Sequence, residues 1–488
     1  MKIKKYLEKQ KLLCDGAFGT YYSSLAGEER VAEQGNFEKP DVVKQVHAAY
    51  IEAGAKLIRT NTFASNTQML SMTVEEVKEN IRAGCRLARE AVEESGKPVY
   101  IAGDIGPIPV KQNPEAEAEY EEICRTFLEE GVDILVFETF SDVETILPVI
   151  KRMKAEQDVF IIVQFCVNQY GYSNSGLSAK RLLAEADVPE IDAVGFNCGV
   201  GPGHLYSILE KCNLDRGKYI TALPNASYPQ IIKNRMVFLE NEEYFVEKMQ
   251  DMEKLGVDIL GGCCGTTPAF IKKMWETLDQ NHRYPHHTIE SEKETSPIKN
   301  SAFYAEKENK KVIAVELAPP MTGDSEKMMD AANSLKNMDV DVVTFPDSPS
   351  GRTRADSVLM AAKVASETGL CVMPHVCCRD KNAIAVRSQL LGAYMNGVSN
   401  FLVVTGDPVP TMIRQSVKSV FNFDSCGLMK IMRDMNKEHF SKKPIVYGGA
   451  INQGRKNLDV EIERVRKKMS MGATFFFTQP IFSKDDAG

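Results

Sequence analysis

Three cysteines give the most specific chemical signal in this 488-residue chain. Cys198 and the adjacent pair Cys263 and Cys264 each end an apolar run that is typical of a buried strand. Three thiolates can bind Zn²⁺ and leave its fourth tetrahedral position free, which is typical of a catalytic zinc rather than a structural one. The cysteines therefore predict a zinc site that accepts a substrate thiol.

The adjacent pair needs an irregular backbone to serve one metal ion. Successive side chains of a regular strand point to opposite faces, so Cys263 and Cys264 could not both point inward. Gly261 and Gly262 before the pair, and Gly265 after it, allow a bend that brings both sulfurs to one ion. The alternative is that these are buried structural thiols, because free Cys is among the most buried residue types. The glycine-framed pair and the third Cys at another strand end favour the metal.

The elements around the cysteines follow a regular rhythm. Over the first ~280 residues short apolar runs alternate with amphipathic segments such as 41–54 and 73–96, which indicates βα units. Eight repeats favour a (β/α)₈ barrel over an open doubly wound sheet, and no dinucleotide-binding Gly pattern follows the first strand. The predicted strands are 12–15, 56–60, 99–103, 134–138, 160–164, 193–197, 219–223 and 258–262.

A polar segment separates this region from a second set of repeats. Residues 281–310 are rich in charged residues and Ser and are predicted to be a linker. Three histidines there (His282, His286 and His287) could bind metal, but a solvated loop is favoured because no Cys is near.

Six further strands are predicted over 311–488, at 312–316, 340–344, 370–375, 401–407, 444–448 and 474–479. They predict a second TIM-type barrel that is incomplete, with two open edges. Either the chain is a fragment or another segment closes this domain.

Composition restricts the classes of function. A net charge of −8 argues against nucleic acid as a partner. No apolar run approaches the ~18 residues of a membrane-spanning helix, so no membrane association is predicted. Twelve irregularly spaced cysteines, with no signal-peptide pattern in the first eleven residues, predict reduced thiols and a cytoplasmic location.

The first 280 residues resemble the homocysteine S-methyltransferase family from residue 4 onward. The similarity rests on Asn-Cys-Gly at Cys198, Gly-Gly-Cys-Cys-Gly at Cys263 and Cys264, the Asp-Gly-Ala-Phe-Gly-Thr segment 15–20 and the Phe-Glu-Thr segment 137–139. The resemblance implies that the three cysteines bind Zn²⁺. It also implies that Asp15, Gly16 and Glu138 hold the amino acid part of homocysteine, with Glu138 facing its ammonium group; the alternative for Glu138 is a solvated carboxylate.

The expected chemistry follows from the charge of the site. Zn²⁺ lowers the pKa of a bound thiol, so homocysteine would bind as the thiolate and accept a methyl group to give methionine. A betaine donor is disfavoured because the single Trp, Trp275, lies in a predicted amphipathic helix and not in an aromatic cage. No Asp-x-His-x-x-Gly element is found, so no bound cobalamin is expected. S-methylmethionine and methyltetrahydrofolate remain as methyl donors.

Residues 311–488 resemble methylenetetrahydrofolate reductase, a flavin-dependent barrel. The similarity rests on Glu-Leu-Ala-Pro-Pro at 316–320, Pro-His at 374–375, Thr-Gly-Asp-Pro at 405–408 and the segment 472–479. It implies that Glu316 is the acid that assists opening of the methylene-folate ring and that Gln479 contacts folate, with NAD(P)H as reductant. The implied FAD contacts are Thr344, His375, Asp407, Glu461 and Lys468. Leu-Ala at 317–318 and Phe-Pro-Asp at 345–347 depart from the family pattern at the flavin and nicotinamide sites.

Together the two halves predict a fused enzyme. A reductase converts methylenetetrahydrofolate to methyltetrahydrofolate, and a zinc methyltransferase makes methionine. One alternative keeps the methyltransferase and makes the second half a flavin-binding or interaction domain without turnover. A second alternative is a non-enzymatic zinc or thiol sensor in which four protein ligands hold the metal, since barrels host many functions.

Overall fold

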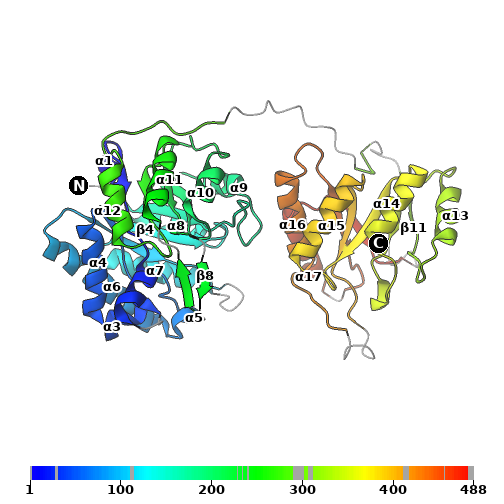
Figure 1. Cartoon of the computed structure of the whole chain (residues 1–488). Coiled ribbons are helices and arrows are strands. Elements are labelled where there is room, and N and C mark those ends of the chain that lie inside the picture. The colour runs from blue at the N-terminus through cyan, green and yellow to red at the C-terminus, as the bar shows by residue number, and fades with distance from the viewer. Residues whose placement is uncertain are drawn as a thin grey trace. The chain divides into compact units, whose positions relative to one another are not determined.

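The computed structural model describes residues 3–27, 31–109, 115–227, 229–232, 235–238, 241–289, 302–305, 311–409, 417–455 and 457–481. The chain divides into two compact units, Met1–Ser291 and Glu292–Gly488. Each unit contains strands and helices that alternate along the chain (Figure 1). Within the described ranges, no helix has the length and apolar character needed to cross a lipid bilayer.

An eight-stranded parallel sheet forms the centre of the first unit. Its strand order is β1-β10-β7-β6-β5-β4-β3-β2, and a parallel bridge between Cys14 and Leu57 links the two ends of that order. The sheet therefore closes, which confirms the predicted (β/α)₈ barrel. The strands are β1 (Leu12–Leu13), β2 (Leu57–Arg59), β3 (Tyr100–Ile105), β4 (Ile134–Phe140), β5 (Phe160–Phe165), β6 (Ala193–Asn197), β7 (Tyr219–Leu223) and β10 (Ile259–Leu260).

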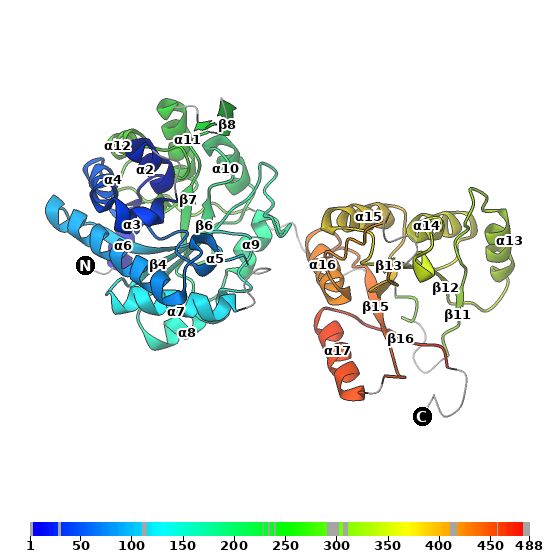
Figure 2. The same ribbon diagram turned by 90° about the horizontal axis from the view of Figure 1, so that it is seen from below.

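Helices surround the strands of this barrel, as the view from below shows (Figure 2). The longest, α6, begins with a capping box between Thr73 and Glu76 and is followed by Gly96, whose φ of +62° is a left-handed value that favours glycine. The helices are α1 (Ile3–Leu7), α2 (Phe18–Ala26), α3 (Gly35–Glu38), α4 (Pro40–Glu52), α5 (Thr67–Leu70), α6 (Val74–Ser95), α7 (Ala116–Glu129), α8 (Leu147–Glu156), α9 (Ala179–Glu185), α10 (Pro202–Leu209), α11 (Glu242–Lys254), α12 (Pro268–Thr277) and the 3₁₀ turn η1 (Ala32–Gln34).

Two cores hold the first unit together. Ala102 and Val136 belong to the core inside the barrel, and a larger core lies between the strands and the helices. Since residues two apart on a strand share a face, Asp104 and Glu138 continue the inward-facing rows toward the carboxyl ends of β3 and β4. The barrel thus places charged side chains at one rim.

One element of the first unit was not predicted. A two-stranded antiparallel hairpin, β8 (Pro229–Ile232) and β9 (Arg235–Phe238), lies between β7 and β10 in the chain and outside the barrel sheet. The eighth barrel strand is therefore β10.

The second unit contains a six-stranded parallel sheet in the order β11-β12-β13-β14-β15-β16, as predicted for a partial barrel. Its core includes Phe345, Phe401 and Met432. The strands are β11 (Ala314–Glu316), β12 (Val342–Phe345), β13 (Val372–Cys377), β14 (Asn400–Val404), β15 (Val446–Ile451) and β16 (Phe476–Thr478). The helices are α13 (Glu326–Leu335), α14 (Ser357–Thr368), α15 (Ala383–Met395), α16 (Ser425–Glu438), α17 (Leu458–Ser470) and the 3₁₀ turn η2 (Pro349–Gly351).

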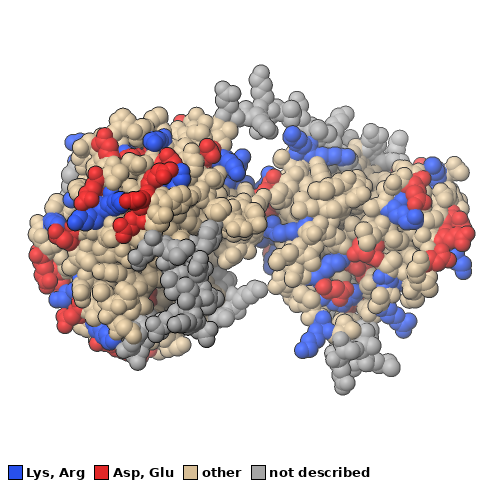
Figure 3. Space-filling model, in the orientation of Figure 1, with Lys and Arg blue, Asp and Glu red and all other residues tan. Residues whose placement is uncertain are grey.

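Acidic and basic side chains are interspersed on the face shown in Figure 3. This distribution agrees with the modest net charge of −8. A surface of mixed sign has no extended positive field of the kind that attracts nucleic acid.

Candidate active sites

The three predicted cysteines lie together at the rim of the first barrel. Cys198 directly follows β6, and Cys263 and Cys264 follow β10. Their sulfur atoms all lie within 4.8 Å of one another, and the Sγ atoms of Cys198 and Cys264 are 3.7 Å apart. Cys198 has a φ of +57°, which is uncommon for a residue other than glycine and is typical of a strained functional position. The predicted juxtaposition of the three thiols is therefore present in the fold.

The spacing and charge of this cluster fit a zinc ion. Zn–S bonds of ~2.3 Å in a tetrahedral site place sulfurs ~3.8 Å apart. The pKa of Cys198 is lowered because the thiols of Cys166, Cys263 and Cys264 hydrogen-bond to its thiolate, and the pKa of Cys264 is raised to about 12, mainly by Cys198. Three thiolates this close together repel one another, so they require a positive ion between them.

A network of buried charges lies beside the cysteines. Arg59 donates from Nε to Asp15 Oδ1 (2.8 Å) and from Nη1 to Glu138 Oε2 (2.5 Å). Its backbone N–H donates to Asp15 Oδ2 (2.8 Å). Asn197 connects the network to the cysteines, because its amide nitrogen lies 3.0 Å from Glu138 Oε2 and 3.9 Å from Cys263 Sγ. The carboxylates are therefore paired by a guanidinium in the same layer of the barrel.

A cavity of about 440 Å³ opens over both groups. Its lining includes the three cysteines and the side chains of Arg59, Asp104 and Glu138. Asp15 and Gly16 are not among the lining residues; Asp15 is 1% exposed and pairs with Arg59, and the carbonyl of Gly16 accepts from Arg59 Nη2 at 2.7 Å. A Cβ on Gly16 would lie 2.7 Å from Thr266 Oγ1, so only glycine fits there. Of the three residues expected to hold homocysteine, Glu138 faces the cavity directly.

Three residues at this rim were not predicted from the sequence. Arg59 and Asp104 are charged residues at the inward-facing ends of β2 and β3, and this alternation within apolar runs was an available signal. Burial and the neighbouring Glu138 carboxylate raise the pKa of Asp104, and Arg59 opposes this effect. Cys166 directly follows β5, as Cys198 follows β6, and its thiol hydrogen-bonds to Cys198.

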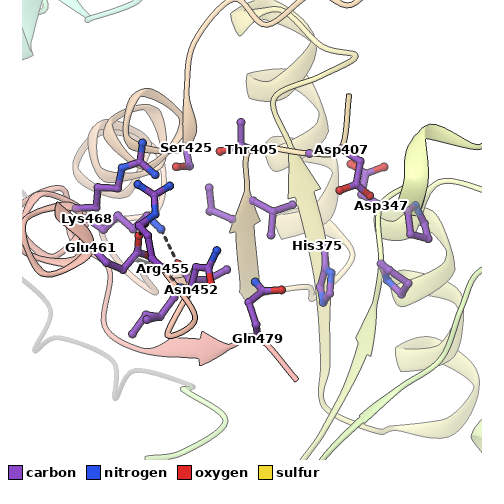
Figure 4. Close-up of a pocket in the computed structure, with 18 of the residues that line it drawn as sticks. Asp347, His375, Thr405, Asp407, Ser425, Asn452, Arg455, Glu461, Lys468 and Gln479 are labelled. Atoms are coloured by element: carbon purple, nitrogen blue, oxygen red, sulfur yellow. Dashed lines mark hydrogen bonds and ion pairs between the residues drawn. The ribbon is translucent and has the colours of Figure 1, made fainter. Parts of the chain in front are cut away.

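The second unit has its own cavity, of about 480 Å³ (Figure 4). Six of the seven residues predicted for this half line it: Glu316, His375, Asp407, Glu461, Lys468 and Gln479. Thr344 is buried in β12 and is not among the lining residues. Glu316 and Gln479 come from opposite edges of the sheet, so the sheet is curled enough for both edges to reach one cavity.

The polar groups of this cavity differ in their surroundings. Burial lowers the pKa of His375 to about 4, and its buried Nε2 has no hydrogen-bond partner in the described part of the chain. Glu461 accepts from the backbone N–H of Asn452 (3.0 Å) and forms an ion pair with Arg455 (3.2 Å). Burial also lowers the pKa of Lys468, whose Nζ donates to the carbonyl of Ala450 (2.6 Å). The cavity therefore offers a neutral imidazole and cationic groups to a ligand.

The three histidines of the predicted linker belong to the first unit, and two of them form side-chain contacts with it. His286 Nε2 lies 2.8 Å from Asp258 Oδ2, and His287 Nε2 lies 2.9 Å from the carbonyl oxygen of Glu210. Among the residues that the structure describes, the three barrel-rim cysteines are the one group of His, Cys, Asp or Glu with metal-binding spacing. The rest of the predicted linker, 290–301 and 306–310, lies outside the described residues.

The barrel with a three-cysteine rim defines the class of protein, and two family models match the chain. Residues 12–278 match Homocysteine S-methyltransferase, and residues 302–487 match Methylenetetrahydrofolate reductase. The first match covers more than half of the chain, so the chain belongs to the homocysteine S-methyltransferase family. It is an enzyme that joins a domain of this family to a methylenetetrahydrofolate reductase domain, which confirms both resemblances.

Curated relatives include two methionine synthases. That of Mycobacterium tuberculosis (strain ATCC 25618 / H37Rv) is 25% identical over 324 residues, 62% of this chain and 27% of that protein. That of Mycobacterium leprae (strain TN) is 26% identical over 292 residues, 55% of this chain and 24% of that protein. The chain thus spans about a quarter of their length. The oxidized form of the Escherichia coli homocysteine methyltransferase MmuM aligns at a TM-score of 0.48 and 20% identity, over 57% of this chain and 99% of that chain.

Proposed function

We propose that the first unit transfers a methyl group to the sulfur of homocysteine and releases methionine. The observation that carries this proposal is the cluster of Cys198, Cys263 and Cys264, which faces a cavity large enough for an amino acid. Three sulfurs satisfy three of the four tetrahedral positions of Zn²⁺, and the cavity gives a substrate sulfur access to the fourth.

Different residues of the rim would bind the sulfur and the ammonium group of homocysteine. Zn²⁺, held by the three cysteines, would lower the pKa of the homocysteine thiol so that it reacts as the thiolate. Glu138 presents a carboxylate to the cavity for the substrate ammonium group. Arg59 holds Glu138 and Asp15 in place, and the left-handed backbone of Cys198 aims its sulfur at the cluster.

The reaction balances as a displacement at carbon. The homocysteine thiol loses its proton, the sulfur forms a bond to the methyl carbon, and the donor leaves with the electron pair of the bond that breaks. A folate methyl group or a sulfonium such as S-methylmethionine could serve as donor. The reductase domain in the same chain favours methyltetrahydrofolate, because joining the two domains raises the local concentration of a shared intermediate.

Methionine formation by a cysteine variant tests this proposal. Cys263→Ala should lose at least ~10³-fold of the methyl-transfer rate, because a metal-held thiolate supplies the nucleophile, and should lose bound zinc. Cys124→Ala, which removes a buried thiol of α7, is the matched control and should keep both. A folded Cys263→Ala protein with an unchanged rate would refute the zinc role. Offering each donor separately identifies the methyl source.

We infer that the cavity of the second unit binds FAD and 5,10-methylenetetrahydrofolate. FAD, when bound, would pass a hydride from NAD(P)H to the methylene carbon of the folate. Support comes from the single cavity that collects Glu316, His375, Asp407, Glu461, Lys468 and Gln479. Glu316 would donate the proton that opens the folate ring, Gln479 would contact the folate, and the others would contact FAD. Thr344 is buried and does not line the cavity, so it would support the lining residues without touching FAD.

Flavin spectroscopy tests the second proposal. The purified chain loaded with FAD should lose absorbance near the flavin band when NADH or NADPH is added, and methylenetetrahydrofolate should restore it. Flavin that binds but is not bleached by either nicotinamide would favour a binding domain without turnover. Glu316→Gln should still be bleached but should not transfer the hydride on to folate.

A further inference from the structure

A third carboxylate, that of Asp104, shares the cavity of the first unit. Asp104 pairs in register with Val136, and Glu138 lies two residues beyond Val136 on the same inward face of β4. Arg59 on β2 pairs with Ala102, two residues before Asp104. The barrel therefore brings Arg59, Asp104 and Glu138 to neighbouring strand ends on its inner face.

The fold leaves one oxygen of the Asp104 carboxylate without a hydrogen-bond partner among the described residues. Its side chain is buried, at 4% exposure, yet Oδ1 has no hydrogen-bond partner among the described residues, and the residue lines the cavity. The backbone of Asp104 is held on both sides: its N–H donates to Thr60 Oγ1 (3.1 Å), and its carbonyl accepts from Thr62 Oγ1 (2.8 Å). A buried polar atom without a partner is costly, so its retention in a cavity points to a ligand that supplies the missing partner.

The other two carboxylates are already engaged by Arg59. Both oxygens of Asp15 accept from Arg59, and Oε2 of Glu138 accepts from Arg59 and Asn197. The Arg59 side chain thus donates hydrogen bonds to two carboxylates, and none of these bonds goes to Asp104. A ligand with a positive charge would offset the negative charge of the third carboxylate in the cavity.

We propose that Asp104 is a positioning residue that receives the ammonium group of the amino acid substrate, together with the free side of Glu138. This inference rests on the proposed methyl transfer to homocysteine and adds a residue that sets its specificity. Asp104 would select a thiol that carries an ammonium group over the same thiol without one, because only the first replaces the missing hydrogen bond and charge.

Binding of two thiols to the zinc-loaded chain tests the proposal. Homocysteine and 4-mercaptobutanoate share the thiol, the carboxylate and the chain length, but only homocysteine has the ammonium group. Calorimetric titration measures Kd for both thiols in the natural chain, in Asp104→Asn and in Asp187→Asn. Asp187 is an exposed carboxylate after α9 and serves as the control. Zinc content and Tm are measured on each sample.

The expected result is a selective loss. Asp104→Asn should raise the Kd of homocysteine by ~10- to 100-fold and should leave the Kd of 4-mercaptobutanoate within about twofold of its value in the natural chain. The reason is that a charge-assisted hydrogen bond is lost only with homocysteine. Zinc content should not change, and Tm should not fall, because the fold gives Oδ1 no partner to lose. Equal weakening of both thiols, or a fall in Tm with unchanged selectivity, would assign Asp104 a structural role and overturn the proposal. If the natural chain binds neither thiol, the methyl-transfer proposal itself fails.

Discussion

The two candidate sites differ in how their charged groups are held. In the first unit Asp15 and Arg59 have side chains that are 1% and 5% exposed, and they are paired with each other. In the second unit Glu316 is exposed on the edge strand β11, and Asp407 is exposed as well. Both sites lie at the carboxyl ends of parallel strands, but only the first lies on a sheet that closes within the described residues.

This difference shows what closure of a barrel does for a site. When the ring closes, every strand has two neighbours, so the groups at its rim lose contact with water, and a charge there is costly unless it is paired. The site of the first unit is therefore ordered before substrate arrives, at a cost in stability if a pair is broken. The second site relies more on its ligands for the final arrangement of its exposed groups.

Removing the guanidinium shared by Asp15 and Glu138 should give the largest difference in stability between the two units. Arg59→Leu leaves Asp15 and Glu138 buried without their partner and should destabilise the first unit by about 3–5 kcal/mol. Calorimetry should show the transition of the first unit at lower temperature and that of the second unit unchanged. Arg152→Leu is the control, since Arg152 forms its ion pairs with Glu117 and Glu121 at the surface, where such pairs add little to stability. Equal losses of stability in the two variants would show that the buried network contributes no more to stability than a surface ion pair.

Removing one buried histidine should change the acid sensitivity of the first unit alone. His47 of α4 is fully buried against Phe18, and neither ring nitrogen has a hydrogen-bond partner among the residues that the structure describes. Burial lowers its pKa from 6.5 to about 3. The unfolded chain binds a proton at this residue below pH ~6.5 while the folded chain stays neutral, so stability falls as the pH drops from 6.5 toward 3. His47→Leu should gain about 3 kcal/mol relative to the natural chain between pH 7 and pH 4.

Denaturant unfolding of the first unit at both pH values measures this change. The pH dependence of the second unit, which contains His375, should be the same in both proteins and is the internal control. A stability difference between the natural chain and His47→Leu that does not vary with pH would show that His47 does not titrate in this way.

A smaller effect is expected from His375 in the second unit. His375→Ala removes a neutral imidazole that lines the cavity and should weaken FAD binding by ~10-fold, which corresponds to about 1.4 kcal/mol. Methyl transfer by the first unit should be unchanged when the donor is supplied. Flavin fluorescence titration measures the affinity, and His439→Ala, at an exposed position after α16, is the control. Unchanged FAD affinity in His375→Ala would remove this residue from the site.

Much of the fold was predictable because alternation of apolar strands and amphipathic helices is a local signal. The eight barrel strands and the six later strands lie where the periodicity places them, within a few residues. The hairpin of β8 and β9 was missed because its segment contains Pro229 and lacks clear alternation. The three cysteines were identified because their type and their flanking glycines are unusual together.

Arg59 and Asp104 could not be assigned from the sequence in the same way. Each is one charged residue at the end of an apolar run, and whether it faces water, a helix or the barrel interior depends on register with neighbouring strands. Pairing between Arg59 and two carboxylates far apart in the chain is a property of the closed ring. The role of Asp104 follows from a missing partner, which only the packed structure reveals.

Zinc X-ray absorption spectroscopy can count the sulfur ligands of the metal and so show whether Zn²⁺ binds the substrate thiol. The zinc-loaded chain without substrate should show three sulfur ligands at ~2.3 Å, and addition of homocysteine should raise the number to four. Cys166 is the neighbouring thiol that could supply a fourth protein ligand. Four sulfurs before homocysteine is added, with no change afterwards, would indicate a structural or sensing zinc. Homocysteine would then not be a ligand of the metal.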